Sequence, residues 1–248
     1  MFTSKEFLHL HLGVDPEIAK FFVDRKIPAD NLYWKGKYLY VASGTGFLFI
    51  PLFIDLQCKL GVNKYDLLEE TYVQLIEAIL HSAALYEHQV ISFEDHLANC
   101  RKLLENRIYN QQLYQDLNVY LTTNDLKPYK NLGTTNRALN RADTFLFSLC
   151  ALKLPRTVVD PIIFHWYTLV PCLLLLDDIT DLKDDLHKNE ENAVTEFGPG
   201  SLGIIRAIEF LKMKFAELRT INSLVADYLE GYLEIGKSSS YMKSLLND

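Results

Sequence analysis

A cluster of five aspartates follows an apolar run and is the part of the sequence best suited to chemistry. The run ends at Leu176, and the acidic residues fall within the next nine positions: Asp177, Asp178, Asp181, Asp184 and Asp185. On a helix, residues three and four apart share a face, so most of these carboxylates would lie on one side. Like charges at this spacing repel, and carboxylates near a helix C-terminus oppose the helix dipole, each by about tenths of a kcal/mol. The cluster therefore predicts a function that compensates for this repulsion.

A divalent cation would stabilise such a cluster. Hard oxygen ligands suit Mg²⁺, which keeps several of its waters and is usually shared between one or two carboxylates and a phosphate. The preceding apolar helix would then line a cavity with the metal at its mouth, a shape that fits an amphiphile with a hydrocarbon tail and a phosphate head.

A solvated acidic helix end is the alternative interpretation of the cluster. Lys183, His187 and Lys188 lie close by in the sequence and offset part of the negative charge. Asp184 and Lys188 are four residues apart, a pair worth roughly a few tenths of a kcal/mol on a helix. Both interpretations remain open from the sequence alone.

Long segments with helical periodicity, separated by glycine and proline, account for most of the chain. In Tyr65–Glu87 the apolar residues recur with the three-four spacing of one buried helix face. We expect helices over Asp15–Arg25, Tyr65–Glu87, Asp95–Leu121, Arg137–Leu154, Asp160–His187 and Ser201–Leu233, with an interruption at Pro171 and a loop over Asn124–Thr135. An aromatic patch that suits a short strand or a loop contains Tyr33, Trp34, Tyr38 and Tyr40. These segments predict one all-α domain over residues 1–248.

Composition limits the class of protein and its partners. The 248 residues are 49% hydrophobic and 23% charged, enough to bury the core of one large domain. The net charge of −7 argues against nucleic acid, whose phosphates need a basic face. The four cysteines are scattered without metal-ligand spacing, and no signal peptide is recognisable, so we expect a cytoplasmic protein. Ile162–Leu176 is shorter than the roughly 20 residues of a membrane span and predicts a buried central helix, with no transmembrane segment.

The aspartate cluster resembles a motif of the all-α trans-isoprenyl diphosphate synthase and class I terpenoid synthase superfamily. In that family a DDxxD sequence follows an apolar helix and binds Mg²⁺ bridged to a prenyl diphosphate; residues 177–181, DDITD, fit the second of its two motifs. Ala78–Gln89 is similar to the helix with the first motif and Arg137–Leu152 to the helix between them, so the resemblance covers roughly Tyr65 to Leu186. It implies an antiparallel helical bundle of the class I terpenoid synthase type, with three catalytic residues: Asp177, Asp178 and Asp181. The same three carboxylates, supported by Asp185 or Asp184, are the magnesium ligands that the resemblance implies.

The first of the two family motifs is missing from this chain. Where its aspartates should stand, the sequence reads His88–Ser92, which contains no carboxylate. The basic Gly-Lys-Arg segment with which chain-elongating members hold isopentenyl diphosphate has only a loose counterpart in Lys35–Lys37. The resemblance therefore argues against ordinary prenyl chain elongation, which holds two diphosphates at once.

Two functions from different classes are compatible with this pattern. The first is a divergent class I terpene synthase-like enzyme, in which Mg²⁺ and one prenyl diphosphate give an allylic cation that cyclises, loses a proton or meets water. The 14 tyrosines, 14 phenylalanines and two tryptophans offer ring faces that stabilise cations, although core packing is the simpler role of any single ring. The second is a catalytically silent prenyl-lipid-binding homologue or a regulatory subunit of a prenyl diphosphate synthase. The resemblance allows a homodimer or a heterodimer with such a synthase.

Cationic side chains would be needed to hold the diphosphate. Arg137 and Arg141 lie on the segment where the family carries lysine, and Lys188 follows the cluster by about one turn. His88 stands where the family places a metal-binding aspartate, so a neutral imidazole there is a candidate base toward a carbocation. A plain surface position is the alternative for each of these residues.

Overall fold

Helices make up most of the part of the chain that the structure describes. In this computed structural model that part comprises residues 4–26, 49–123 and 127–247. It contains no strand, only an isolated antiparallel bridge between Tyr129 and Leu132, which confirms the expected all-α class. The predicted aromatic patch and the Lys35–Lys37 segment lie outside the described residues. The helices are α1 (Lys5–Leu10), α2 (Pro16–Asp24), α3 (Phe49–Lys59), α4 (Lys64–Leu67), α5 (Glu70–Glu87), α6 (Phe93–Leu104), α7 (Gln111–Thr122), α8 (Arg156–Lys188), α9 (Gly200–Arg219), α10 (Ser223–Lys237) and α11 (Ser240–Asn247), with the 3₁₀ helices η5 (Ala138–Asn140), η6 (Asp143–Ala151) and η7 (Ala193–Phe197).

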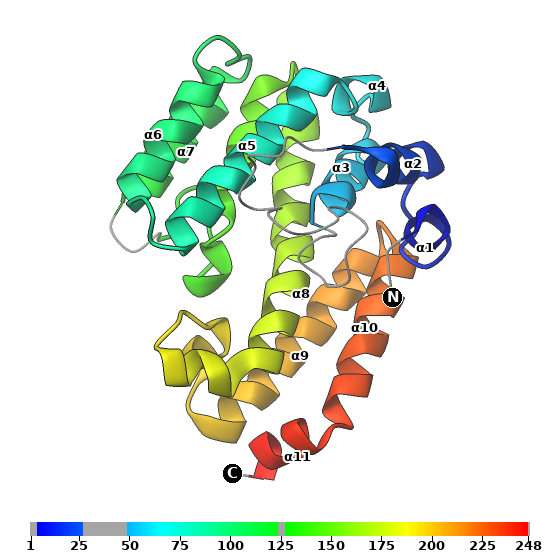
Figure 1. Cartoon of the computed structure of the whole chain (residues 1–248), viewed down its shortest axis with the longest axis vertical. Coiled ribbons are helices and arrows are strands. Elements are labelled where there is room, and N and C mark those ends of the chain that lie inside the picture. Colours follow the sequence, from blue (N-terminus) through cyan, green and yellow to red (C-terminus); the bar gives the residue numbers. More distant parts are fainter. Residues whose placement is uncertain (1–3, 27–48, 124–126, 248) are drawn as a thin grey trace.

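Helix α8 is the central element and runs through the middle of the molecule in Figure 1. Helices α3, α9 and α10 pack against it. It continues through both Pro161 and Pro171, so the expected interruption at Pro171 is wrong. A proline inside a helix removes one backbone hydrogen bond and destabilises it by about 3 kcal/mol. Burial of all the residues from 168 to 173 offsets this loss.

By length and composition, α8 is also the one helix of the described residues that could cross a membrane. Its apolar window of 18 residues is 61% buried inside the protein. The core helix of a soluble protein has the same composition, and the contacts of α8 with α3, α9 and α10 bury much of its apolar surface within this fold.

The segment Asp95–Leu121 forms two helices instead of the predicted single one. Helix α6 begins with a capping box, in which Ser92 and Asp95 each accept from the other's backbone N–H, and it ends at Leu104. Helix α7 begins where the Asn110 side chain accepts from the backbone N–H of Leu113 at 3.1 Å. Local capping therefore divides a segment whose apolar pattern alone predicts one helix.

The segment Arg137–Leu154, predicted as an α-helix, instead forms the 3₁₀ helices η5 and η6. Every residue from 143 to 150 is buried. Helix η6 contacts α5, α6 and α7, which leaves no solvent-facing side over these residues. An amphipathic α-helix buries only one face, whereas this segment is buried on all sides. Its conformation is therefore determined by contacts with neighbouring elements and not by the periodicity of its sequence.

The carboxylate of Asp143 is buried at the start of η6. Its Oδ2 accepts from the hydroxyls of Tyr120 at 2.6 Å and Tyr167 at 2.8 Å, and its Oδ1 accepts from the indole N–H of Trp166 at 2.8 Å. Burial raises the pKa of Asp143 to about 6. The three hydrogen bonds join η6 to α7 and α8, and they fix the backbone immediately before Thr144.

The segment Ser201–Leu233 also divides, into α9 and α10, which pack against each other. Asn222 caps α10 by accepting from the backbone N–H of Val225 at 3.2 Å, and its Nδ2 donates to the carbonyl of Leu12 at 2.8 Å. One side chain therefore starts a C-terminal helix and also holds the turn between α1 and α2.

Gly203, near the start of α9, lies against the end of η7. A Cβ at this position would lie 2.1 Å from the carbonyl oxygen of Gly198, a backbone atom that cannot rotate away. We expect Gly203→Ala to lower the free energy of unfolding by about 1–3 kcal/mol, as overpacking does, measured by urea denaturation. Gly231→Ala in α10 is the matched control, because a Cβ there meets nothing within 4 Å and alanine favours a helix by about 1 kcal/mol. An equal rise in the free energy of unfolding of both variants would contradict the close approach at Gly203.

Candidate functional site

The five aspartates of the cluster all lie on α8, but their environments differ. Asp177, Asp181 and Asp184 are exposed, and Asp185 is half-buried. Asp178 is only 3% exposed. Asp177 and Asp181 lie one helical turn apart on the solvent side, whereas Asp178 turns toward the core.

The Asp178 carboxylate binds an arginine and a backbone amide. Its Oδ1 accepts from Arg141 Nη2 at 2.7 Å, and its Oδ2 accepts from Arg141 Nη1 at 3.1 Å and from the backbone N–H of Ala193 at 2.7 Å. The Asn192 side chain donates to the carbonyl of Asp178 at 2.7 Å and to Asp185 Oδ2 at 2.8 Å. Both oxygens of Asp178 therefore have partners, and a two-point pair with arginine is among the strong hydrogen-bonded arrangements in proteins.

Asp177 and Asp181 are the carboxylates of the DDITD segment that remain open to solvent. Partial loss of solvent, followed by repulsion from Asp181 and Asp178, raises the pKa of Asp177. Partial loss of solvent, followed by repulsion from Asp185 and Asp184, raises the pKa of Asp181. A bound cation would relieve this repulsion.

The fit of a magnesium ion depends on what completes its coordination. Within the described residues, no group of three or more His, Cys, Asp or Glu side chains is placed to hold a metal, so a cage made of protein ligands alone does not fit. A Mg²⁺ ion shared with a phosphate needs only one or two carboxylates, so Asp177 and Asp181, the exposed carboxylates of the DDITD segment, are the candidates for that role. Asp178 does not fit unless it releases Arg141.

A pocket of about 400 Å³, here called the arginine pocket, lies beside this region. Its lining residues come from α5, α6, the end of α7, η5 and η6, together with Glu191 after α8. Its apolar and aromatic walls are formed by Tyr86, Phe93, Leu97 and Leu121. Its polar lining includes two arginines and two carboxylates beside neutral groups: Arg137, Arg141, Glu94, Glu191, Asn140 and Thr144. The rings of Tyr86 and Phe93 are 5.3 Å apart between centroids. The pocket therefore combines guanidinium groups with an apolar wall.

The other predicted residues lie outside the arginine pocket. The DDITD aspartates do not line it and are connected to it through Arg141, which pairs with Asp178. Lys188 is exposed in the last turn of α8, where its charge acts on Asp181. His88 is the exposed C-cap of α5. Arg137 and Arg141 are thus the two predicted diphosphate ligands that the structure brings into one pocket.

Sequence reasoning missed a buried polar chain behind the pocket wall. His96 is 1% exposed, its Nδ1 lies 2.9 Å from Ser82 Oγ, and its Nε2 lies 3.0 Å from Thr144 Oγ1. Burial lowers the pKa of His96 to about 4, so the ring is neutral near pH 7. These residues come from α6, α5 and η6, and their spacing in the sequence carries no signal. A histidine on the buried face of α6, beside Leu97 and Cys100, is the only hint that the pattern offers.

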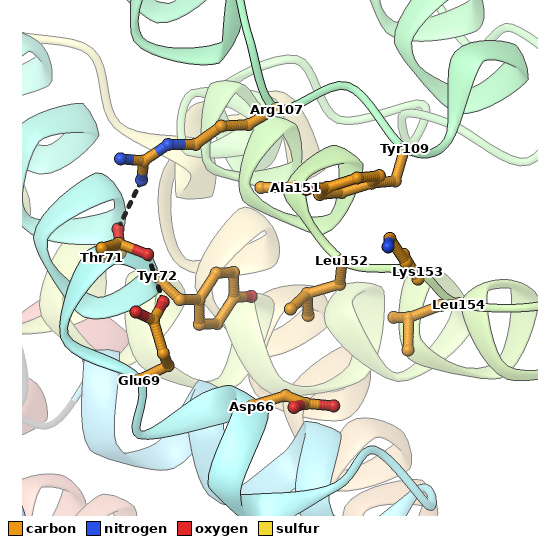
Figure 2. Close-up of a pocket in the computed structure, with 10 residues that line it drawn as sticks. All are labelled: Asp66, Glu69, Thr71, Tyr72, Arg107, Tyr109, Ala151, Leu152, Lys153 and Leu154. Atoms are coloured by element: carbon orange, nitrogen blue, oxygen red, sulfur yellow. Dashed lines mark hydrogen bonds between the residues drawn. The ribbon is translucent and has the colours of Figure 1, made fainter.

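A second pocket, of about 330 Å³, lies between the start of α5 and the end of η6 and is drawn in Figure 2. Arg107 Nη1 donates to the Thr71 carbonyl at 2.9 Å, and Lys153 Nζ lies 4.8 Å from the ring centroid of Tyr109. Asp66 and Glu69 contribute acidic groups to the same pocket. None of the residues predicted for a functional site lines it.

Arg141 lines the arginine pocket and pairs with Asp178, the buried carboxylate of the DDITD segment, while the exposed Asp177 and Asp181 do not line the pocket. The positive charge of Arg141 also favours the ionised form of Asp177 and partly offsets the rise in its pKa. Comparison of the chain with protein-family models, curated proteins and solved structures finds no match.

Proposed function

We propose that the protein binds a prenyl diphosphate in the arginine pocket and ionises it with Mg²⁺, as a divergent class I terpene synthase-like enzyme. One observation carries the proposal: Arg137 and Arg141 line the same pocket as Tyr86 and Phe93. Guanidinium groups suit phosphate oxygens, and the aromatic wall suits a hydrocarbon chain. The volume of about 400 Å³ falls in the range of roughly 300–1,000 Å³ that holds small ligands.

Arg141 can hold a phosphate and Asp178 at the same time. It directs Nη1 to Asp178 and to the Ala138 carbonyl at 3.0 Å, and Nη2 to Asp178. A guanidinium carries five N–H donors, so donors remain for a ligand. In this proposal Asp178 is a positioning residue that fixes the direction of Arg141.

The remaining steps follow from the character of the pocket. Mg²⁺ held by Asp177 and Asp181 would supply charge neutralisation for the departing diphosphate. Arg137 and Arg141 would bind the same charge, and the ring faces of Tyr86 and Phe93 would stabilise an allylic cation. Leu97 and Leu121 would exclude water from that cation.

A catalytically silent homologue is the second candidate function. The observation that favours it is the full use of both Asp178 oxygens by Arg141 and Ala193, which removes one carboxylate of the DDITD segment from metal binding. Such a protein would bind a prenyl lipid, or act as the regulatory subunit of a prenyl diphosphate synthase, in a homodimer or heterodimer.

Incubation with geranyl, farnesyl or geranylgeranyl diphosphate and Mg²⁺ tests the enzyme. We expect diphosphate release and volatile or hydrated products, and a loss of about 100-fold or more in the double variant Asp177→Asn/Asp181→Asn, because the metal would lose its protein ligands. Glu209→Gln, a neutralisation at an exposed position of α9, is the matched control and should leave the rate unchanged.

Two outcomes separate the candidates. Tight binding of these diphosphates without release, unchanged in the double variant, would contradict the enzyme and support the silent homologue. Failure of the wild-type protein to bind any of the three would contradict both candidates.

A further inference from the structure

The polar chain behind the arginine pocket consists of four residues, each in contact with the next: Asn99, Ser82, His96 and Thr144. Asn99 Nδ2 lies 3.1 Å from Ser82 Oγ, which lies 2.9 Å from His96 Nδ1. His96 Nε2 lies 3.0 Å from Thr144 Oγ1, and Thr144 lines the pocket. Ser82, His96 and Thr144 are all at most 4% exposed, so most of the chain is closed to water.

The donors and acceptors available give this chain a direction. Asn99 donates to Ser82 Oγ, and the single hydroxyl hydrogen of Ser82 has one acceptor among the described residues, which is His96 Nδ1. Nδ1 is then the acceptor of the neutral ring, so Nε2 carries the hydrogen and donates to Thr144 Oγ1. The opposite tautomer would leave the buried Ser82 hydroxyl without an acceptor, which is unfavourable.

The direction of the chain leaves one hydrogen unused at its end. With its oxygen accepting from His96, the Thr144 hydroxyl hydrogen has no acceptor among the described residues. Thr144 forms part of the wall of the arginine pocket, whose lining also includes Arg137 and Arg141. An oxygen atom of an anionic ligand is the partner that this donor and these two cations share.

We propose that Thr144 donates a hydrogen bond to a phosphate oxygen of a prenyl diphosphate in the arginine pocket, and that His96 and Ser82 are positioning residues that aim its hydroxyl. This inference rests on the proposed function and adds a neutral, directional donor to the two charged ones. His96 itself does not touch the ligand, because the ring is buried and both nitrogens have protein partners. The neutral ring keeps the chain in one direction near pH 7.

Substitution of Thr144 tests the donor by removing the hydroxyl while keeping the shape. The probe is a thio analogue of farnesyl diphosphate, whose carbon–sulfur bond resists ionisation, titrated calorimetrically in the presence of Mg²⁺. We expect Thr144→Val to weaken its binding about 10-fold or more, because a hydrogen bond to a charged acceptor is lost, and Thr144→Ser to stay within about threefold of the wild type. Farnesol, which lacks the diphosphate, should bind Thr144→Val and the wild-type protein equally.

The tautomer of His96 provides a readout that a purely structural role would not produce. In ¹⁵N–¹H correlation spectra of the free wild-type protein, we expect the hydrogen on Nε2 and not on Nδ1. Ser82→Ala should perturb this tautomer and weaken binding of the analogue in the same direction as Thr144→Val.

The outcomes distinguish this inference from the function on which it rests. Equal binding of the analogue by the wild-type protein and Thr144→Val, or a hydrogen on His96 Nδ1, overturns the role of Thr144 and leaves the proposed function intact. Failure of the wild-type protein to bind the analogue overturns both. Urea denaturation of Thr144→Val and Thr144→Ser confirms that folded proteins are compared.

Discussion

Replacement of Asp143 by alanine is expected to lower the free energy of unfolding by about 3 kcal/mol or more. The variant leaves two buried donors, on Tyr120 and Trp166, and a half-buried one, on Tyr167, without their acceptor, and each unsatisfied buried group is unfavourable by about 1–3 kcal/mol. A cavity adds to the loss. Urea denaturation at pH 7 measures it, and a loss below about 1 kcal/mol would contradict the role of this carboxylate in joining η6 to α7 and α8.

Asp143→Asn is the matched control, because it keeps one acceptor and removes the titrating group. The pKa of Asp143 is about 6 in the folded protein, above its ordinary value of 3.8, so the folded state binds a proton more readily than the unfolded chain. The stabilisation from this proton is complete below about pH 4 and is lost as the pH rises through about 6. The stability of the wild type relative to Asp143→Asn should therefore fall by about 2 kcal/mol between pH 4 and pH 7. A difference independent of pH would contradict this titration.

Asp178→Asn and Asp177→Asn should affect the free energy of unfolding in different ways, although the two residues are adjacent in the DDITD segment. Asp178→Asn leaves Arg141 without its counter-charge at a position where the arginine side chain is 25% exposed, and we expect a loss of about 3 kcal/mol. Asp177→Asn removes a charge that its neighbours disfavour, and because solvent screens the repulsion, the expected change is a gain of at most a few tenths of a kcal/mol.

Measurement of both variants by urea denaturation, with and without Mg²⁺, separates a structural carboxylate from a ligand-binding one. Added Mg²⁺ and prenyl diphosphate should stabilise the wild type more than Asp177→Asn, which keeps only Asp181 of the two exposed carboxylates, since binding to the folded state raises its apparent stability. Equal losses for the two variants in the absence of ligand would contradict the different environments of Asp177 and Asp178.

Two of the longest helices follow directly from the apolar pattern, because each presents a regular buried face. Asp160–His187 was predicted within a few residues of α8, and Tyr65–Glu87 corresponds to α4 and α5. The division between α4 and α5 lies at Glu69, whose backbone is extended and whose side chain makes no capping hydrogen bond. A break at a single residue leaves the apolar spacing on either side intact, so periodicity over a long window does not resolve it.

The segment from Arg137 to Leu154 shows where the pattern fails. Its apolar residues are spaced like those of a helix, but residues 143 to 150 are enclosed by α5, α6 and α7, so contacts with other elements select the 3₁₀ conformation. The same enclosure hides the Ser82–His96–Thr144 chain from sequence reasoning. These three residues come together only when α5, α6 and η6 pack, and residue type alone gives no reason to connect them.

The sequence predicts which charged residues belong to the candidate site but not which of them form ion pairs. The sequence predicts that Arg141 binds the diphosphate and that the DDITD segment binds the metal, whereas the structure pairs Arg141 with Asp178. The spacing of aspartates on a helix indicates which share a face, but the direction of that face depends on how α8 is rotated against α3 and α9. That rotation is a property of the whole core.

The hydrogen bond from Asn222 to Leu12 has a consequence for the order in which the molecule assembles. It connects residues 210 positions apart and holds the turn between α1 and α2. During synthesis the N-terminal helices leave the ribosome first, but this partner arrives only after α9 has been made. The turn between α1 and α2 therefore lacks this contact until nearly the whole protein has been translated. Closing this large loop belongs to the last stage of folding.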